Sequence, residues 1–177
     1  MKWLTGIVLC LFVGLAACDF ACFNNTIGKC QKRWFQDHHP EEFTLCTMQP
    51  PLTFCLYEGA IICQTGFANL VEKAYFIQNS VCSEGTYANK VVKNDPVCKI
   101  ETLTNTTGCN DEISTYKKRK ELVGLGNKLC YNLDKTVECM FRKFEVCTRD
   151  TQVVFRRVYE SLAAAMKEVC KLMDEQQ

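Results

Sequence analysis

The chain has 177 residues, of which 47% are hydrophobic and 23% charged, and its formal net charge is +1. This composition is typical of one globular domain or two small ones and excludes an intrinsically disordered protein. The near-neutral charge also argues against nucleic acid or an anionic membrane surface as the partner.

Residues 1–18 have the pattern of a secretory signal peptide. One lysine precedes an apolar run that ends in small residues, and cleavage after Ala16, Ala17 or Cys18 fits the pattern. Whether Cys18 is retained therefore stays open, and the same junction also fits a bacterial lipobox. No later stretch approaches 18 apolar residues, so we expect a soluble, secreted, extracellular protein without a membrane span.

Three helices are expected in residues 19–95. The first runs through Trp34-Phe35, and Pro50-Pro51 opens the second, because proline is tolerated in a first helical turn. The third carries apolar residues at three- and four-residue spacing between Phe67 and Val81.

Three further helices are expected in residues 96–177. The first runs from Ile113 to Leu133, and the second carries the apolar residues between Val137 and Phe144. The last has an apolar stripe from Phe155 to Met173, with Asp150 as its cap and lysines in its final turns. Strand alternation and hairpin signals are missing, so the sequence predicts an all-α fold.

Aromatic side chains fall mostly on the faces that we expect to be buried. They are Trp34, Phe35, Phe54, Phe67, Tyr75, Phe141, Phe144, Phe155 and Tyr159. Core packing is the expected use of these residues, and a helical pocket for an apolar ligand is the alternative.

Fourteen cysteines place the chain among disulfide-rich proteins. Cys10 leaves with the signal peptide, and loss of Cys18 would leave twelve, an even number that predicts a disulfide framework. The twelve are Cys22, Cys30, Cys46, Cys55, Cys63, Cys82, Cys98, Cys109, Cys130, Cys139, Cys147 and Cys170.

The spacing of these cysteines indicates an internal duplication. Cys130, Cys139 and Cys147 each lie 84 residues after Cys46, Cys55 and Cys63, and a leucine precedes the first cysteine of both triplets. The two Asn-x-Thr glycosylation sites, at Asn24 and Asn105, each precede the second cysteine of their half. We therefore predict two homologous six-cysteine helical units, at residues 19–95 and 96–177.

Helix geometry limits how the cysteines can pair. Eight residues of helix advance about 12 Å, whereas a disulfide needs Cα atoms within about 7 Å. Cys55 therefore cannot bond Cys63 on one helix, nor Cys139 bond Cys147. Cys82 is expected to pair with Cys46 or Cys55, and Cys63 with Cys22 or Cys30, although six cysteines allow fifteen pairings.

Patterns that would indicate catalysis or metal binding are missing. No Cys-x-x-Cys pair occurs, the only histidines are adjacent (His38 and His39), and no serine lies in a Gly-x-Ser-x-Gly elbow. The Cys-Cys-x-x-His-x-x-Cys helix of phospholipases A2 is also absent. We predict that the protein is not an enzyme and has no cofactor. The basic run Lys117–Lys120 is interpreted as a solvated helix face, with proteolytic processing or a glycosaminoglycan site as alternatives.

Two resemblances rest on the cysteine steps. The twelve cysteines with their two Cys-x7-Cys steps resemble the twelve-cysteine secreted helical domains of unknown function in nematodes, which implies an extracellular module. The stretch FCLYEGAIICQTGF, residues 54–67, is similar to the helical core of con-ikot-ikot toxins of cone snails, which implies action on a receptor. The adjacent cysteine pairs of those toxins are missing here.

The sequence thus predicts a secreted, N-glycosylated protein that binds an extracellular protein or receptor. The alternatives are a toxin-type effector that acts on a receptor or channel, and a carrier of small apolar ligands. The identity of the partner, the disulfide connectivity and the oligomeric state stay open.

Overall fold

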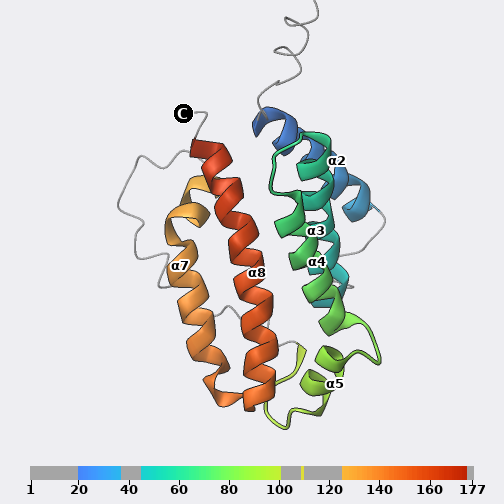
Figure 1. Ribbon diagram of the computed structural model, residues 1–177, viewed down its shortest axis with the longest axis vertical. Helices are drawn as coiled ribbons and strands as arrows, with labels where there is room; N and C mark the ends of the chain where they lie inside the picture. Colours follow the sequence, from blue (N-terminus) through green and yellow to red (C-terminus); the bar gives the residue numbers. More distant parts are fainter. Residues whose placement is uncertain (1–19, 37–44, 101–108, 110–124, 175–177) are drawn as a thin grey trace, which may run out of the picture.

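The computed structural model describes residues 20–36, 45–100, 109 and 125–174. Each regular element in these ranges is a helix, which confirms the all-α, disulfide-rich fold class. The helices are α2 (Phe20–Gln36), α3 (Leu45–Ile62), α4 (Ala68–Cys82), α5 (Tyr87–Asn94), α7 (Leu125–Lys143), the 3-10 helix η3 (Phe144–Val146) and α8 (Arg149–Asp174). Figure 1 shows α7 and α8 side by side, with α4 against α8 and α3 beside α4.

Helix α8 packs against both halves of the chain. At 26 residues it is about 39 Å long, and it lies along α4 and α7. Its amino-terminal half buries Val154, Phe155 and Val158 in a cluster with Met140 and Phe144. Val81 and Val92 of the first half belong to that same cluster, so residues from both halves form this part of the core.

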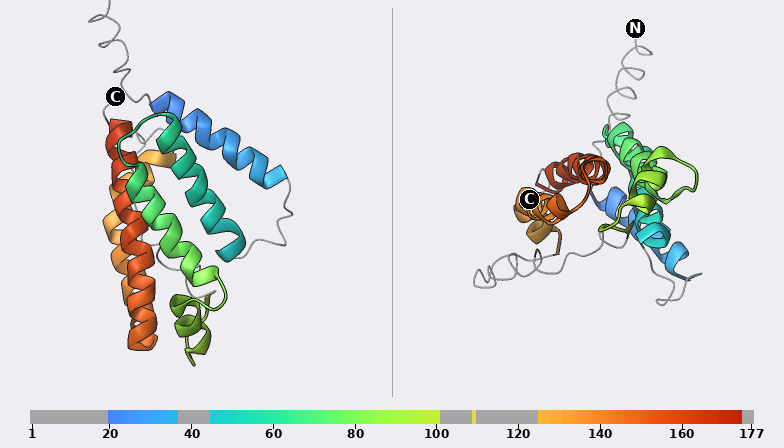
Figure 2. Two further views of the ribbon diagram at one scale, coloured as in Figure 1. Left: turned by 45° about the vertical axis from the view of Figure 1, so that its right-hand side comes forward. Right: turned by 90° about the horizontal axis from the view of Figure 1, so that it is seen from below.

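A second buried cluster forms at the other end of α8. Ala165, Val169 and Leu172 of α8 pack there against Phe23 of α2 and Phe67, just before α4. The rings of Phe23 and Phe67 meet edge to face with centroids 5.5 Å apart. Neither cluster is confined to one half of the chain, so the two halves share their core. Figure 2 shows α2 lying obliquely across α3 at this end of the helix bundle.

Six disulfides join the twelve cysteines, and none of these bonds crosses between the halves. In the first half they are Cys22–Cys63, Cys30–Cys55 and Cys46–Cys82, and in the second Cys98–Cys147, Cys109–Cys139 and Cys130–Cys170. Numbered along each half, the cysteines pair first with fifth, second with fourth and third with sixth in both. Cys55 and Cys139 do not bond Cys63 and Cys147, as the helix geometry requires.

Helix α3 begins earlier than its prolines led us to expect. The helix starts at Leu45, so Pro50 and Pro51 lie inside it rather than at its opening. Each proline removes one backbone hydrogen bond. The Cys46–Cys82 disulfide ties the turn before the prolines to the end of α4, and this tertiary link holds the turn in the helix.

Helix α7 is one continuous element where we expected the end of one helix and the start of another. It runs from Leu125 to Lys143 without proline or glycine after Gly126, so nothing in it breaks the helix. The beginning of the expected helix, at residues 113–124, lies outside the described residues. Helix α5, which was not predicted, begins at the cap Thr86, whose hydroxyl accepts a hydrogen bond from the Asn89 amide at 3.1 Å.

The expected helices in the third and last positions are confirmed as α4 and α8. The prediction of Asp150 as the cap of α8 is wrong, because the helix begins one residue earlier and Asp150 lies in its first turn. The carboxylate of Asp95, which precedes Thr148 by 53 residues in the chain, lies at this end of α8 instead. Asp95 accepts hydrogen bonds from the Thr148 amide at 2.9 Å and from the Thr148 hydroxyl at 2.6 Å.

Asp95 is almost fully buried, at 2% exposure, where the two halves meet. Its carboxylate also accepts hydrogen bonds from the amides of Val97 and Cys98, at 2.9 and 2.8 Å. Burial alone would raise the pKa of Asp95, but hydrogen bonds from Thr148, Cys98, Thr151 and Val97 outweigh it and hold the pKa well below its ordinary value. The ionised carboxylate thus links α5, the Cys98 segment and the start of α8.

Candidate interaction surface

The disulfide residues predicted from sequence form the scaffold and offer no free thiol. Of the two predicted glycosylation sites, Asn24 is exposed on α2, whereas Asn105 lies outside the described residues. His38, His39 and Lys117–Lys120 also lie outside them. Within the described ranges no group of three His, Cys, Asp or Glu residues could hold a metal ion. None of the helices described there is long and apolar enough to cross a membrane.

An open groove runs between α2 and α3 and is named here the α2–α3 groove. Its wall on α2 carries three cationic side chains, and its wall on α3 carries one carboxylate and one exposed aliphatic side chain. The lining residues are Thr26, Lys29, Lys32, Arg33, Gln36, Glu58 and Ile62.

Two disulfides and one close contact fix the walls of the groove. Cys22–Cys63 and Cys30–Cys55 join α2 to α3 and the residue that follows α3. Between them, Gly59 lies so close to α2 that a Cβ there would meet Phe23 and Ile27 side chains at 3.1 Å. The register of α2 on α3 is therefore set by covalent bonds and by the lack of a side chain at Gly59.

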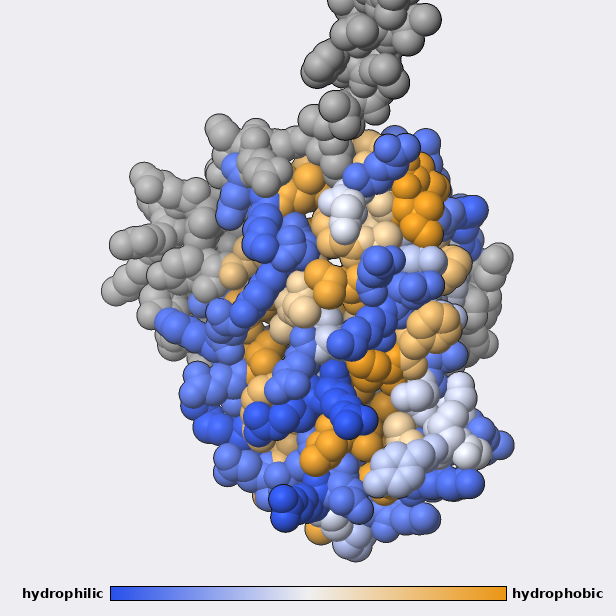
Figure 3. Space-filling model, viewed as in Figure 1, coloured by the Kyte–Doolittle hydropathy of each residue, from blue (hydrophilic) through white to orange (hydrophobic). Residues whose placement is uncertain are grey.

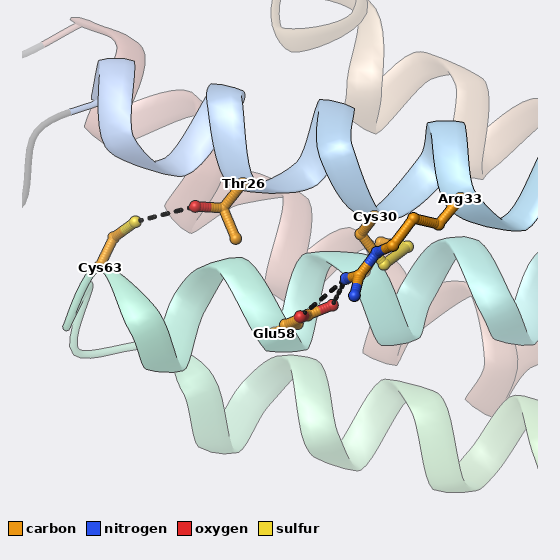
Figure 4. A network of polar contacts seen from close by, with 6 residues as sticks. Thr26, Cys30, Arg33, Glu58 and Cys63 are labelled. Atoms are coloured by element: carbon orange, nitrogen blue, oxygen red, sulfur yellow. Dashed lines mark hydrogen bonds and ion pairs between the residues drawn. A yellow bond between two sulfur atoms is a disulfide. The ribbon is translucent and has the colours of Figure 1, made fainter.

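Charge is unevenly distributed in the groove. The Arg33 guanidinium donates two hydrogen bonds to the Glu58 carboxylate, one to each oxygen at 3.0 Å, as Figure 4 shows. Lys29 and Lys32 are exposed, and no residue in the described ranges forms an ion pair with either of them. Three cations against one carboxylate leave the groove with a formal charge of +2.

A second feature borders the groove: an apolar surface on α3 and α4, named here the α3–α4 face. Five of the nine exposed large hydrophobic side chains in the described residues belong to these two helices, and Figure 3 shows apolar patches over them. The five are Phe54, Ile61, Ile62, Leu70 and Phe76. The expectation that Phe54 faces the core is wrong, because α3 buries Thr53 and Cys55 and leaves Phe54 45% exposed.

Aromatic rings connect α3 to α4 across this face. Phe54 packs on Tyr57 and Tyr75 with centroid distances of 6.2 and 5.7 Å, and Tyr75 packs on Phe76 at 5.6 Å. The Tyr57 hydroxyl donates a hydrogen bond to the Glu72 carboxylate at 3.1 Å. That bond, with burial and the Glu72 charge acting in the same direction, raises the pKa of Tyr57. Tyr57 and Tyr75 thus support the rings of Phe54 and Phe76, which stay exposed to solvent.

The groove and the face were not predicted from the sequence, although one signal for the groove is present in it. Lys29, Lys32 and Arg33 are spaced by three and one residues, which places all three along one side of a helix. The apolar face gives no such signal, because its residues have the same spacing as core residues.

Comparison of the chain with protein-family models, with curated proteins and with solved structures gave no match. The resemblances to the nematode twelve-cysteine domains and to the con-ikot-ikot toxins therefore stay predictions.

Proposed function

We propose that this protein is a secreted extracellular binding protein without catalytic activity, which recognises its partner with the α3–α4 face. Six disulfides support an oxidising compartment, because such bonds persist mainly in proteins outside the cytosol. The effector and carrier alternatives stay predictions.

The observation that carries the proposal is the exposure of large apolar side chains on α3 and α4. Phe76 is 60% exposed and Ile62 is 56% exposed, although the chain buries other phenylalanines completely. Phe54, Tyr75 and Phe76 form a connected aromatic cluster across α3 and α4, and an exposed apolar cluster on a folded protein is typical of an interaction site. Aromatic side chains, phenylalanine included, are enriched at such interfaces.

A duplicated scaffold further supports the assignment of this face. The shared pairing order of the cysteines supports the duplication, because six cysteines could pair in fifteen ways. At the spacing of 84 residues, Phe54 corresponds to Glu138 and Ile61 corresponds to Glu145, both of which are exposed. Two equivalent surface positions are thus apolar in the first unit and acidic in the second, whereas Ile62 corresponds to Val146 and is exposed and apolar in both. A binding surface acquired by one copy of a duplicated scaffold would differ in this way.

Photo-cross-linking tests the proposal directly. The full chain is secreted from eukaryotic cells with a photoreactive phenylalanine analogue at position 76, and it is then exposed to the extracellular fluid of its native tissue. We expect a cross-linked adduct at this position and none when the analogue replaces Glu138 on α7. The variant Phe54→Glu/Ile61→Glu, which copies the second unit, should remove the adduct without loss of secretion. Equal adducts at positions 76 and 138, or none at either, would contradict the proposal.

A further inference from the structure

The α2–α3 groove lies beside the α3–α4 face, and the two meet at Ile62, which belongs to both. We propose that the groove binds an extended peptide segment of the partner, one with acidic side chains beside an apolar side chain. This inference rests on the proposed function and names the chemistry of the partner.

The cations of the groove are available to such a segment in two ways. Lys29 and Lys32 are exposed and form no ion pair with a described residue, so peptide carboxylates can bind them directly. The Arg33 side chain is 68% exposed even though it is paired with Glu58. Because a guanidinium has five N–H donors and Glu58 uses two hydrogen bonds, Arg33 can also donate to a second carboxylate.

The remaining lining residues favour a peptide over a sulfated saccharide. Ile62 presents an aliphatic side chain that is 56% exposed, for which a saccharide has no matching apolar group. Glu58 places one carboxylate among the cations, which disfavours an occupant with an anionic group on every unit relative to a peptide whose acidic side chains alternate with uncharged ones. Thr26 and Gln36 add a hydroxyl and an amide that can hydrogen-bond an extended backbone.

The predicted glycan would leave the groove open. Asn24 and Lys29 are five residues apart on α2, which turns them about 140° from one another around the helix axis. Lys32 is about 80° from Asn24 around the axis but eight residues, or about 12 Å, further along α2, so a glycan on Asn24 is attached away from the cationic wall.

Fluorescence anisotropy with a defined probe tests the inference on the full secreted chain. The probe is a fluorescein-labelled octapeptide of alternating glutamate and leucine, and the control peptide has glutamine at each glutamate. We expect the glutamate peptide to bind at least about tenfold more tightly than the glutamine peptide, and salt to weaken it. Lys29→Glu/Lys32→Glu should weaken binding about tenfold. Lys73→Glu/Lys90→Glu, an equal charge change at exposed lysines elsewhere, should leave it unchanged.

Failure of the glutamate peptide to bind, or equal binding by the Lys29→Glu/Lys32→Glu variant, would overturn the inference. Tighter binding of a heparin-derived hexasaccharide that the same variant loses would also overturn it, in favour of a sulfated saccharide. The cross-link at position 76 separates the two proposals. An adduct there without peptide binding supports the α3–α4 face as the partner site and overturns the peptide site in the groove. Peptide binding without an adduct supports the groove and contradicts the role of the α3–α4 face.

Discussion

The Asp95 carboxylate holds the start of α8 through Thr148, 53 residues later in the chain, with one hydrogen bond from the Thr148 amide and one from its hydroxyl. None of the six disulfides joins the two halves, so this contact and the shared hydrophobic core connect them. The packing of α2–α4 against α8 therefore depends on both.

Asp95→Asn should lower the free energy of unfolding by about 2–4 kcal/mol, because a buried amide cannot accept all of the hydrogen bonds that the carboxylate accepts. Urea unfolding with the disulfides intact measures the change. Asp134→Asn is the matched control, because its ion pair with Lys167 is exposed to solvent and should contribute less than about 1 kcal/mol. Equal effects of the two variants would contradict the assigned role of Asp95.

The stabilisation by Asp95 should be lost in acid. An unfolded aspartate titrates near 3.8, whereas the folded pKa of Asp95 lies well below that value. As the pH falls below about 4, the unfolded chain therefore binds a proton that the folded chain does not, and stability decreases. Urea unfolding at a series of pH values from 6 to 2 should show that the difference in unfolding free energy between the native chain and Asp95→Asn becomes smaller in acid. A difference that is constant over this range would disprove the linkage.

Gly59→Ala should destabilise the protein by about 1–3 kcal/mol, because the added Cβ would meet Phe23 and Ile27 at 3.1 Å and push α2 from α3. Gly28→Ala is the control on the same pair of helices. Gly28 is exposed within α2 with nothing within 4 Å of its added Cβ, so alanine should stabilise the helix by about 0.5–1 kcal/mol. The thermal unfolding temperature should fall for Gly59→Ala and rise for Gly28→Ala. A change in the same direction for both variants would contradict the close packing of α2 on α3 at Gly59.

Two phenylalanines should behave differently on substitution by alanine. Phe155 is 0% exposed and packs edge to face on Phe144 at 4.8 Å, so Phe155→Ala should cost about 3–5 kcal/mol. Phe76→Ala, at a 60% exposed position, should change the unfolding free energy by less than about 1 kcal/mol and yet weaken partner binding. Denaturation and binding measured on the same preparations check both, and a large loss of stability in Phe76→Ala would place that residue in the core.

Helix spacing was sufficient to predict α4 and α8, because their apolar stripes are long and uninterrupted. It failed for the start of α3, where the Cys46–Cys82 disulfide outweighs the proline signal. It failed also for α7, where two expected helices are joined without a break. Periodicity describes which face is apolar and says nothing about what covers it, so the exposure of Phe54 and the sharing of the core between the halves could not be predicted.

The long-range polar contacts could not be predicted from the sequence either. A lone aspartate before Pro96 is typical of a turn, and only the fold brings Asp95 to Thr148. The charges of the α2–α3 groove are visible in the sequence, but the pairing of Arg33 with Glu58 depends on the register that Cys22–Cys63 and Cys30–Cys55 impose.

Disulfide mapping of the secreted chain by mass spectrometry under non-reducing conditions tests whether the scaffold consists of two halves, each closed by three disulfides of its own in the same pairing order. We expect six bridges, each within its own half, with cysteines paired first with fifth, second with fourth and third with sixth. A bridge between the halves, a different order in the second half, or a Cys55–Cys63 bond would contradict it.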